Sequence, residues 1–150
     1  MIKIAIGVDH RGVQQKNYIL QMCQEHVGEK IEWIDVGCSD PTYCDYPLYA
    51  IEVSKLMQKK VVERGVLLCG TGIGMAITAN RYPGIYAGLA WNEDVARLAH
   101  EHDKVNVLVL PSDYVANDQA VAMIHAWLSA KFLGGKYQQR IDMIDAIKLV

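Results

Sequence analysis

A cysteine stands where an apolar run meets a run of alternating glycines. The segment Val66–Ala76 reads VLLCGTGIGMA, so Cys69 ends the apolar run and is followed by Gly70, Gly72 and Gly74. Backbone amides in such a turn can face an anion, and a helix that begins there adds the positive end of its dipole. The same field would lower the pKa of the thiol. The segment indicates a thiolate beside an oxyanion site; the alternatives are a tight turn without a ligand and a small core cysteine.

Other side chains could transfer protons or hold an anion. Asp9 and His10 follow the first apolar run, where the alternative is a helix cap beside a solvated histidine. His102 falls in the last turn of a predicted helix, where a histidine often only complements the dipole. Lys136 and Arg140 are four residues apart and share one helix face, which is either solvated or a phosphate clamp.

The spacing of residues excludes several common kinds of site. Met75 occupies the third glycine position of a dinucleotide-binding Gly-x-Gly-x-x-Gly, and no P-loop Gly-Lys-Ser/Thr occurs. The four cysteines form neither Cys-x-x-Cys nor a zinc-type Cys/His spacing. We therefore expect no metal site, and thiols that are reduced.

Charge and hydropathy narrow the class of protein. The net charge is −2 and the pI is about 6.2, so the chain carries no basic stripe for nucleic acid and no membrane-surface helix. No apolar run approaches the ~20 residues that span a bilayer, and the first ten residues lack the features of a signal peptide. We expect a cytoplasmic protein with neither a nucleic-acid nor a membrane partner.

The elements that must position these residues alternate along the chain. Short apolar runs predict strands at 2–8, 31–36, 66–69, 85–91 and 105–110. Longer amphipathic stretches predict helices at 12–27, 47–60, 73–80, 93–101, 117–132 and 137–147. Continuous apolar strands are typical of a sheet covered on both faces. The pattern predicts one α/β domain over residues 1–150: a doubly wound, five-stranded parallel sheet with helices on both faces and a C-terminal helix. Ligands bind outside the carboxyl ends of such strands, where Asp9, His10 and Cys69 fall.

Several segments resemble the type B ribose-5-phosphate isomerases, whose superfamily includes the galactose-6-phosphate isomerases. They read IAIGVDHRG at 4–12, DYPLYA at 45–50, LLCGTGIGMAITANRYPGIYAGLA at 67–90, EHDKVNVLVL at 101–110 and GGKYQQRIDMI at 134–144. The resemblance implies a flavodoxin-like (Rossmann-like) domain that needs no metal or organic cofactor. It also implies a homodimer, or a dimer of dimers, whose active site lies where two subunits meet. The reaction that it implies moves a carbonyl between C1 and C2 of a sugar phosphate through an enediolate.

The resemblance further implies roles for individual residues. Cys69 resembles the base that removes the carbon-bound proton, and the loop Gly70–Gly74, which includes Thr71, resembles the oxyanion hole. Asp9 matches the residue that handles the hydroxyl protons, and His102 the residue that opens the furanose ring. Substrate-pocket positions are matched by His10, Tyr46 and Asn106, and phosphate-binding positions by Arg140 and by Lys136, where an arginine is common.

The chain also departs from the pattern of this family. Asp113 stands where an arginine that helps to hold phosphate is usual, Tyr137 where a histidine is common, and Asp103 where an amide is usual. Arg11 stands where a small or apolar residue is usual, and we hypothesise that it replaces the missing cation. The alternative is a different substrate whose hydroxyl groups pair with Asp113.

Three functions remain open at this point. The first is an aldose–ketose isomerase that interconverts ribose 5-phosphate and ribulose 5-phosphate, with Cys69 as the base. The second is an isomerase of another sugar phosphate, either a hexose 6-phosphate or a rarer pentose. The third is a small-ligand or nucleotide-binding module without turnover, in which Cys69 serves only for packing.

Overall fold

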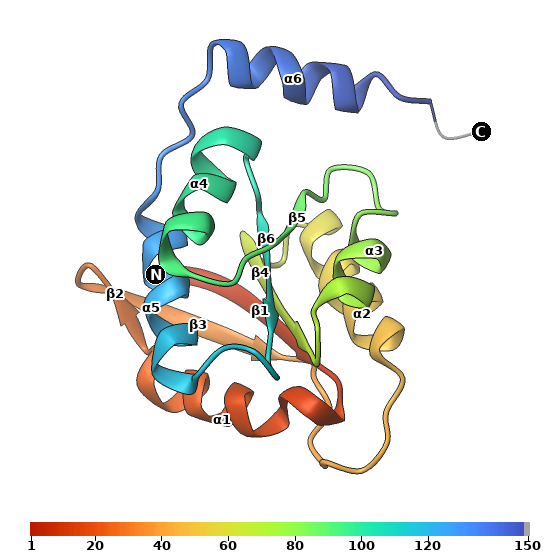
Figure 1. Cartoon of the computed structure of the whole chain (residues 1–150), viewed down its shortest axis with the longest axis vertical. Coiled ribbons are helices and arrows are strands. Elements are labelled where there is room, and N and C mark those ends of the chain that lie inside the picture. The colour runs from red at the N-terminus through yellow and green to blue at the C-terminus, as the bar shows by residue number, and fades with distance from the viewer. Residues whose placement is uncertain (149–150) are drawn as a thin grey trace.

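One sheet, flanked by helices on both faces, organises the chain (Figure 1). The computed structural model describes residues 1–148; residues 149–150 of the predicted domain lie outside the described residues. The order across the six-stranded sheet is β2-β3-β1-β4-β6-β5. All neighbours are parallel except β2 and β3. The strand bounds are β1 Ile2–Val8, β2 Glu25–His26, β3 Glu29–Asp35, β4 Arg64–Cys69, β5 Ala87–Leu89 and β6 Val107–Pro111.

The predicted α/β class and the five parallel strands are confirmed, and two details of the sheet differ. The sixth strand, β2, is a short antiparallel addition at the edge. The last two parallel strands are exchanged relative to the 2-1-3-4-5 order of flavodoxin, because β6 lies between β4 and β5. The exchange places the carboxyl ends of β1, β4 and β6 side by side.

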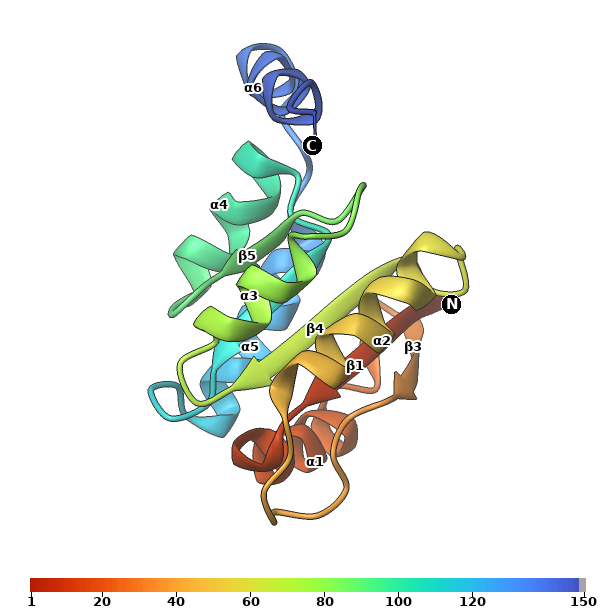
Figure 2. The same cartoon turned by 90° about the vertical axis from the view of Figure 1, so that its right-hand side faces the viewer.

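The helices form a layer on each face of the sheet. The pair α2 (Tyr46–Gln58) and α3 (Ile73–Ala79) covers one face, in front of β1 and β4 in Figure 2. The other face is covered by α1 (Val13–Met22), α4 (Glu93–Asp103) and α5 (Asn117–Ser129). Between these layers and the sheet lie two apolar cores, one around Leu108 and Trp127 and one around Leu67 and Met75.

The helix predicted at 12–27 is too long. A 3₁₀ turn, η1 (His10–Gly12), precedes α1, and α1 ends at Met22. The chain then forms a hairpin in which Glu25–His26 pairs with Glu29–Lys30 across Val27 and Gly28. Both turn residues have positive φ, 50° and 74°, as a two-residue hairpin turn requires. Val27 is 87% exposed at this turn. Because it is apolar, it extended the helical pattern of apolar residues in the sequence.

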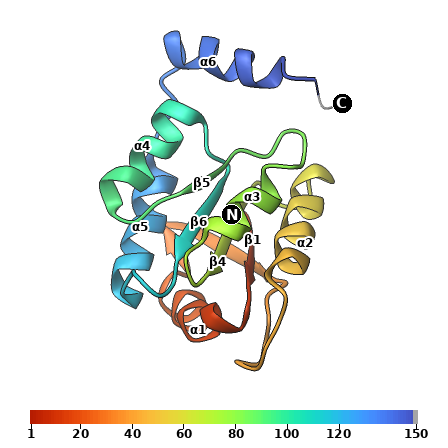
Figure 3. The same ribbon diagram turned by 45° about the vertical axis from the view of Figure 1, so that its right-hand side comes forward.

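The last helix, α6 (Lys136–Asp145), stands apart from the sheet. Gly134 and Gly135, with φ of 66° and 54°, turn the chain between α5 and α6. Figures 1 and 3 show α6 crossing beyond the end of α4. Ile141 is buried, whereas Met143, Ile144 and Ile147 are exposed. This helix therefore presents an uncovered apolar surface.

No helix among residues 1–148 is long and apolar enough to cross a membrane.

A histidine pair joins the hairpin to α5 and makes stability depend on pH. The Nδ1 atoms of His26 and His125 lie 2.9 Å apart, and Ser129 Oγ lies 3.2 Å from His26 Nε2. Burial, reinforced by the charge of His125, lowers the pKa of His26. The unfolded chain therefore takes up this proton at a higher pH than the folded chain does, and acid favours unfolding.

We expect the melting temperature to fall as the pH is lowered from about 7 to about 5, through the ordinary pKa range of histidine. His26→Gln removes the titrating ring and should reduce this slope, although buried His100, whose pKa burial also lowers, keeps part of it. Thermal unfolding of both proteins across the range checks the prediction. An unchanged slope in His26→Gln would contradict it.

Candidate active site

Three strand ends meet at the carboxyl edge of the sheet. The loops after β4 and β6 are tied together, because Ser112 N donates to Cys69 O (2.9 Å) and Asp113 N donates to Gly70 O (3.1 Å). The loop after β1 joins them through Asp9 N, which donates to Leu68 O at 3.4 Å. We call the predicted site residues of this edge the carboxyl-edge cluster: Asp9, His10, Arg11, Tyr46, Cys69, Gly70, Thr71, Gly72 and Gly74.

The Cys69 sulfur lies inside its own turn. Gly72, with φ of 77°, lets the chain fold back so that its N–H donates to Cys69 Sγ at 3.2 Å. The residue is only 5% exposed. Burial raises the pKa of the Cys69 thiol, while the amides of Met75, Gly72 and Thr71 lower it and the charge of Asp9 raises it; the net direction is upward. The predicted position at the strand end is confirmed, but the predicted low pKa is wrong because desolvation outweighs the amides.

Asp9 is both a cap and a buried carboxylate beside the thiol. It is 5% exposed, and its Oδ1 accepts a hydrogen bond from Arg11 N (3.0 Å) at the start of η1. The cap that sequence considerations offered as an alternative therefore exists. The second carboxylate oxygen remains available to a ligand hydroxyl, so capping does not exclude a chemical role. Thr71, in contrast, is exposed, and its Oγ1 accepts from Ile73 N at 3.3 Å.

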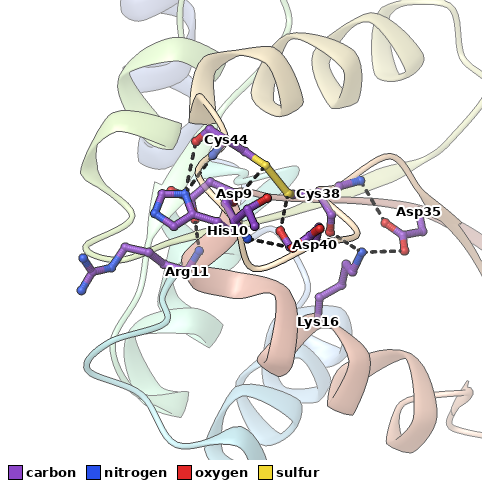
Figure 4. Close-up of a disulfide and its surroundings, with 10 residues drawn as sticks. Asp9, His10, Arg11, Lys16, Asp35, Cys38, Asp40 and Cys44 are labelled. Atoms are coloured by element: carbon purple, nitrogen blue, oxygen red, sulfur yellow. Dashed lines mark hydrogen bonds and ion pairs between the residues drawn. A yellow bond between two sulfur atoms is a disulfide. The ribbon is translucent and has the colours of Figure 1, made fainter.

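His10 forms one wall of a hollow with the loop that precedes α2 (Figure 4). His10 Nδ1 lies 3.2 Å from Cys44 N and 3.3 Å from Cys44 O, so the ring is hydrogen-bonded to the Cys44 backbone. The ring of Tyr43 lies 5.4 Å from the imidazole, centroid to centroid. The hollow measures about 450 Å³. Its lining residues are Asp9, His10, Tyr43, Cys44, Asp45, Tyr46, Pro47 and Leu48.

Two glycines of the predicted oxyanion loop are needed for close packing. A Cβ at Gly74 would lie 2.4 Å from Tyr46 Cζ, so the tyrosine ring rests directly on the start of α3. A Cβ at Gly70 would lie 2.8 Å from Arg11 Nε and 3.0 Å from Asp113 Oδ2. Arg11 Nη2 donates to Asp113 Oδ2, and this ion pair crosses the Gly70 turn. Arg11, the cation predicted to help bind phosphate, thus lies at this edge and is paired with Asp113.

The remaining predicted residues lie at the opposite edge. The helix α4 begins beyond the carboxyl end of β5 and returns, so His102 near its end lies by the amino ends of β5 and β6. Asn106 directly precedes β6 at this edge. Its Oδ1 accepts a hydrogen bond from Tyr86 N (2.9 Å), and its Nδ2 donates to Gly84 O (2.9 Å). We call His102, Asn106, Lys136, Tyr137 and Arg140 the amino-edge cluster.

Tyr137 organises the amino-edge cluster. Its ring stacks on His102 with centroids 4.3 Å apart and planes inclined by 4°. Lys136 Nζ and Arg140 Cζ lie 5.2 and 5.7 Å from the centre of the same ring. An imidazole and two cations therefore gather around one aromatic ring, an arrangement suited to an anion with a nearby proton donor.

A groove of about 980 Å³ adjoins this cluster beneath α6. It runs between residues 80–89, the outer side of α4 and the last turn of α6, and His102 and Ile144 both line it. The two clusters therefore lie at opposite edges of one sheet, and a single chain does not bring Cys69 and His102 together. Among residues 1–148, no cluster of three metal-ligating side chains occurs.

Known proteins match this chain over almost its whole length. The sequence profile described as Ribose/Galactose Isomerase matches residues 4–144. The chain belongs to this family. Ribose-5-phosphate isomerase B of Escherichia coli is 38% identical over 149 residues, which cover 99% of this chain and 97% of that protein. The putative sugar phosphate isomerase YwlF of Bacillus subtilis is 38% identical over 145 residues, 96% of this chain and 95% of that protein.

Solved structures of the Ribose/Galactose Isomerase family share the fold. The type B ribose 5-phosphate isomerase of Trypanosoma brucei superimposes with a TM-score of 0.92 at 33% identity, covering 97% of this chain and 98% of that chain. The Mycoplasma genitalium ribose-5-phosphate isomerase B with bound ribulose-5-phosphate gives a TM-score of 0.85 at 34% identity, covering 96% of this chain and 94% of that chain.

Sequence analysis missed some contacts of these two clusters. Cys38 and Cys44 are joined by a disulfide, so the expectation of reduced thiols is wrong for this pair. The contact of Tyr43 with His10 and the stacking of Tyr137 on His102 were also not foreseen. The six-residue spacing of the cysteines was the one available signal, because aromatic stacking between distant segments has no local pattern.

The raised pKa of Cys69 predicts a characteristic pH profile for its alkylation. Only the thiolate reacts, so its rate with iodoacetamide should rise about tenfold per pH unit through neutrality, without a plateau below about pH 8.5. Cys23 is a control: burial raises its pKa to about 11, and it is fully buried. Peptide mass spectrometry follows both residues separately. A plateau of the Cys69 rate near neutral pH would contradict the assigned direction.

Proposed function

We propose that this member of the Ribose/Galactose Isomerase family is an aldose–ketose isomerase of sugar phosphates, with ribose 5-phosphate and ribulose 5-phosphate as the default pair. The observation that carries the proposal is the Cys69 sulfur within a turn of backbone amides beside the carboxylate of Asp9. The Escherichia coli relative named ribose-5-phosphate isomerase B, 38% identical to this chain, supports the choice of substrate. We also propose a cytoplasmic location, where charged sugar phosphates are retained.

Cys69 is the base in the proposed mechanism. Its thiolate takes the proton from C2 of the open-chain aldose, and the electron pair of that bond forms the double bond of an enediolate. Negative charge then develops on the carbonyl oxygen, where the amides of the Gly70–Gly74 loop can receive it; one such donor contributes about 3 kcal/mol. Asp9 moves the proton between the two hydroxyl oxygens, and Cys69 returns its proton to C1.

Desolvation of the thiol has two opposing effects on this reaction. A raised pKa makes the thiolate a stronger base toward a weakly acidic C–H bond. It also reduces the thiolate fraction at neutral pH. Burial of Cys69 to 5% exposure also limits the access of water to the thiolate. The buried position of Cys69 thus makes its thiolate a stronger base and shields it from water, while a smaller fraction of the protein carries the thiolate at neutral pH.

The proposed active unit is a homodimer in which each site combines the carboxyl-edge cluster of one chain with the amino-edge cluster of its partner. His102 then opens the sugar ring, and Lys136 and Arg140 hold the phosphate. The apolar residues left uncovered support such an assembly, since Ile144 and Ile147 of the C-terminal segment and Ile73 and Ile77 on α3 are at least half exposed. Asn106 supports this edge through its hydrogen bonds to residues 84 and 86.

Proton exchange at C2 tests the proposed reaction. In D2O, the protein should exchange the C2 proton of ribose 5-phosphate and form ribulose 5-phosphate, as followed by NMR. Cys69→Ala should reduce the rate by at least about a thousandfold, the scale of losing a positioned base. Cys23→Ala, which removes the other free cysteine, is the matched control and should retain turnover.

Two results would count against this function. Absence of exchange with every pentose and hexose phosphate would favour the binding module. Persistent exchange in Cys69→Ala would exclude Cys69 as the base. The relative kcat/KM values for pentose and hexose phosphates identify the preferred substrate.

Arg11 should strengthen the binding of the phosphorylated substrate. Asp113 fixes its guanidinium over Gly70, and Arg11 is exposed, so donors beyond the ion pair remain available to a phosphate. We expect Arg11→Ala to raise KM at least about tenfold with little change in kcat. The control is Arg97→Ala, because Arg97 is an ion-paired arginine on α4. An unchanged KM in Arg11→Ala would show that the pair with Asp113 serves structure alone.

A further inference from the structure

The loop between β3 and α2 carries a covalent link beside the candidate active site. Cys38 and Cys44 are disulfide-bonded (Figure 4). Cys23 and Cys69 are free. We propose that Cys38 and Cys44 form a thiol–disulfide exchange site that sets the position of the His10 wall and thereby the affinity for substrate. The effect on substrate rests on the proposed isomerase function; the exchange itself does not.

The Cys38 end of this loop is anchored to the body of the protein. Cys38 N donates to Val8 O at 2.9 Å, and Lys16 Nζ donates to Cys38 O at 2.8 Å. Lys16 also pairs with Asp35 at 2.9 Å, and its side chain is only 3% exposed. These contacts belong to β1, α1 and β3. They do not involve the sulfur atom, so they persist when the disulfide is reduced.

The Cys44 end depends far more on the disulfide. Residues 39–43 are exposed, and their hydrogen bond from Thr42 N to Asp40 Oδ1 is local. Among the described residues, Cys44 is hydrogen-bonded to the body of the protein only at His10, whose Nδ1 lies 3.2 Å from Cys44 N and 3.3 Å from Cys44 O. Reduction would leave this hydrogen bond, together with the packing of partly buried Cys44 against the apolar core around Leu108, as the tether between the loop and the His10 wall.

Movement at Cys44 reaches both sides of the hollow. On one side it changes the hydrogen bond between His10 Nδ1 and the Cys44 backbone, together with the contact of Tyr43 with the imidazole. On the other side Tyr43 Oη donates to Asp45 Oδ1 at 2.8 Å, and Asp45 precedes the first residue of α2, Tyr46. The Tyr46 ring rests on Gly74 at the start of α3. The disulfide thus holds the loop whose residues line the hollow.

The exchange proceeds with an external disulfide such as oxidised glutathione. Cys44 is the more exposed of the two cysteines, so its thiolate attacks one sulfur of the external disulfide and releases one glutathione thiolate. Cys38 then loses its proton and attacks the Cys44 sulfur of the mixed disulfide, which releases the second. The two protein thiols are oxidised and the external disulfide is reduced to two thiols.

The first experiment measures the state of the pair without reference to turnover. The protein is equilibrated in buffers of varied reduced and oxidised glutathione and labelled with a maleimide, and the peptides are weighed. Cys38 and Cys44 should lose their labels together as the buffer becomes oxidising, whereas Cys23 and Cys69 do not form this bond. A pair that stays fully labelled in oxidised glutathione would overturn the proposal.

The second experiment measures the consequence at the site. With ribose 5-phosphate, KM should be at least about threefold lower in the disulfide form than in the dithiol form, with kcat within about twofold, because binding rather than proton abstraction changes. The Cys38→Ser/Cys44→Ser double variant should keep the higher KM in both buffers. Cys23→Ser is the matched control and should remain sensitive.

A third readout separates failure of this proposal from failure of the proposed function. The imidazole NMR signals of His10 should differ between the two redox forms and stop responding in the double variant, whether or not the protein turns over a sugar. If Cys38 and Cys44 exchange with glutathione but the His10 signals are unchanged, the disulfide does not set the position of His10 and the inference fails. If KM alone is unchanged in an active enzyme, the link to substrate affinity fails.

Discussion

Parallel strands impose the constraint on which the candidate site depends. All carboxyl ends of such strands meet at one edge of the sheet, and each crossover helix must return the chain to the other edge. Cys69 ends β4 and therefore lies at the carboxyl edge, with Asp9 from the end of β1. His102 lies near the end of α4, a returning helix, and must lie at the opposite edge. The two clusters thus lie at opposite edges of one fold, and the proposed homodimer brings the carboxyl edge of one chain to the amino edge of its partner.

At the carboxyl edge, the balance between desolvation and backbone amides sets the chemistry of Cys69. The Gly72 amide donates directly to the sulfur, which favours a thiolate, yet burial and Asp9 favour the neutral thiol and prevail. A base for a C–H proton benefits from this outcome, because basicity is gained while water is excluded. The glycines around Cys69 do more than expose amides. Gly72 supplies the positive φ that folds the turn, and Gly70 and Gly74 admit the Arg11–Asp113 pair and the Tyr46 ring.

Local patterns predicted the sheet and the carboxyl-edge cluster because these depend on residues close in sequence. The apolar run that ends at Cys69, followed by glycines, was enough to locate a strand, a turn and a helix start. The hairpin at Val27–Gly28 was missed because its apolar turn residue extended the helical pattern. The low thiol pKa was predicted from the helix terminus alone, since burial depends on packing that no short segment reveals.

The contacts that distinguish this chain join residues far apart in sequence. Arg11 and Asp113 are separated by 102 positions. The sequence therefore showed an unusual arginine and an unusual aspartate, but not that the two side chains form an ion pair. Tyr137 on His102 and Tyr43 on His10 likewise depend on how α6 and the 37–45 loop are placed. The sequence was enough to place Asp9 and Cys69 at strand ends, whereas the ion pair, the aromatic contacts and the disulfide became visible only in the structure.

Subunit complementation tests most directly whether the two edges of different chains form one site. Cys69→Ala and His102→Ala are each purified, mixed in equal amounts and allowed to exchange subunits. Heterodimers carry one intact site, so the mixture should recover about a quarter of the unmodified activity if subunits pair at random. A mixture of Cys69→Ala and Asp9→Ala, both altered at the carboxyl edge, should recover none. Recovery that fails in the first mixture, despite proven subunit exchange, would contradict the shared site.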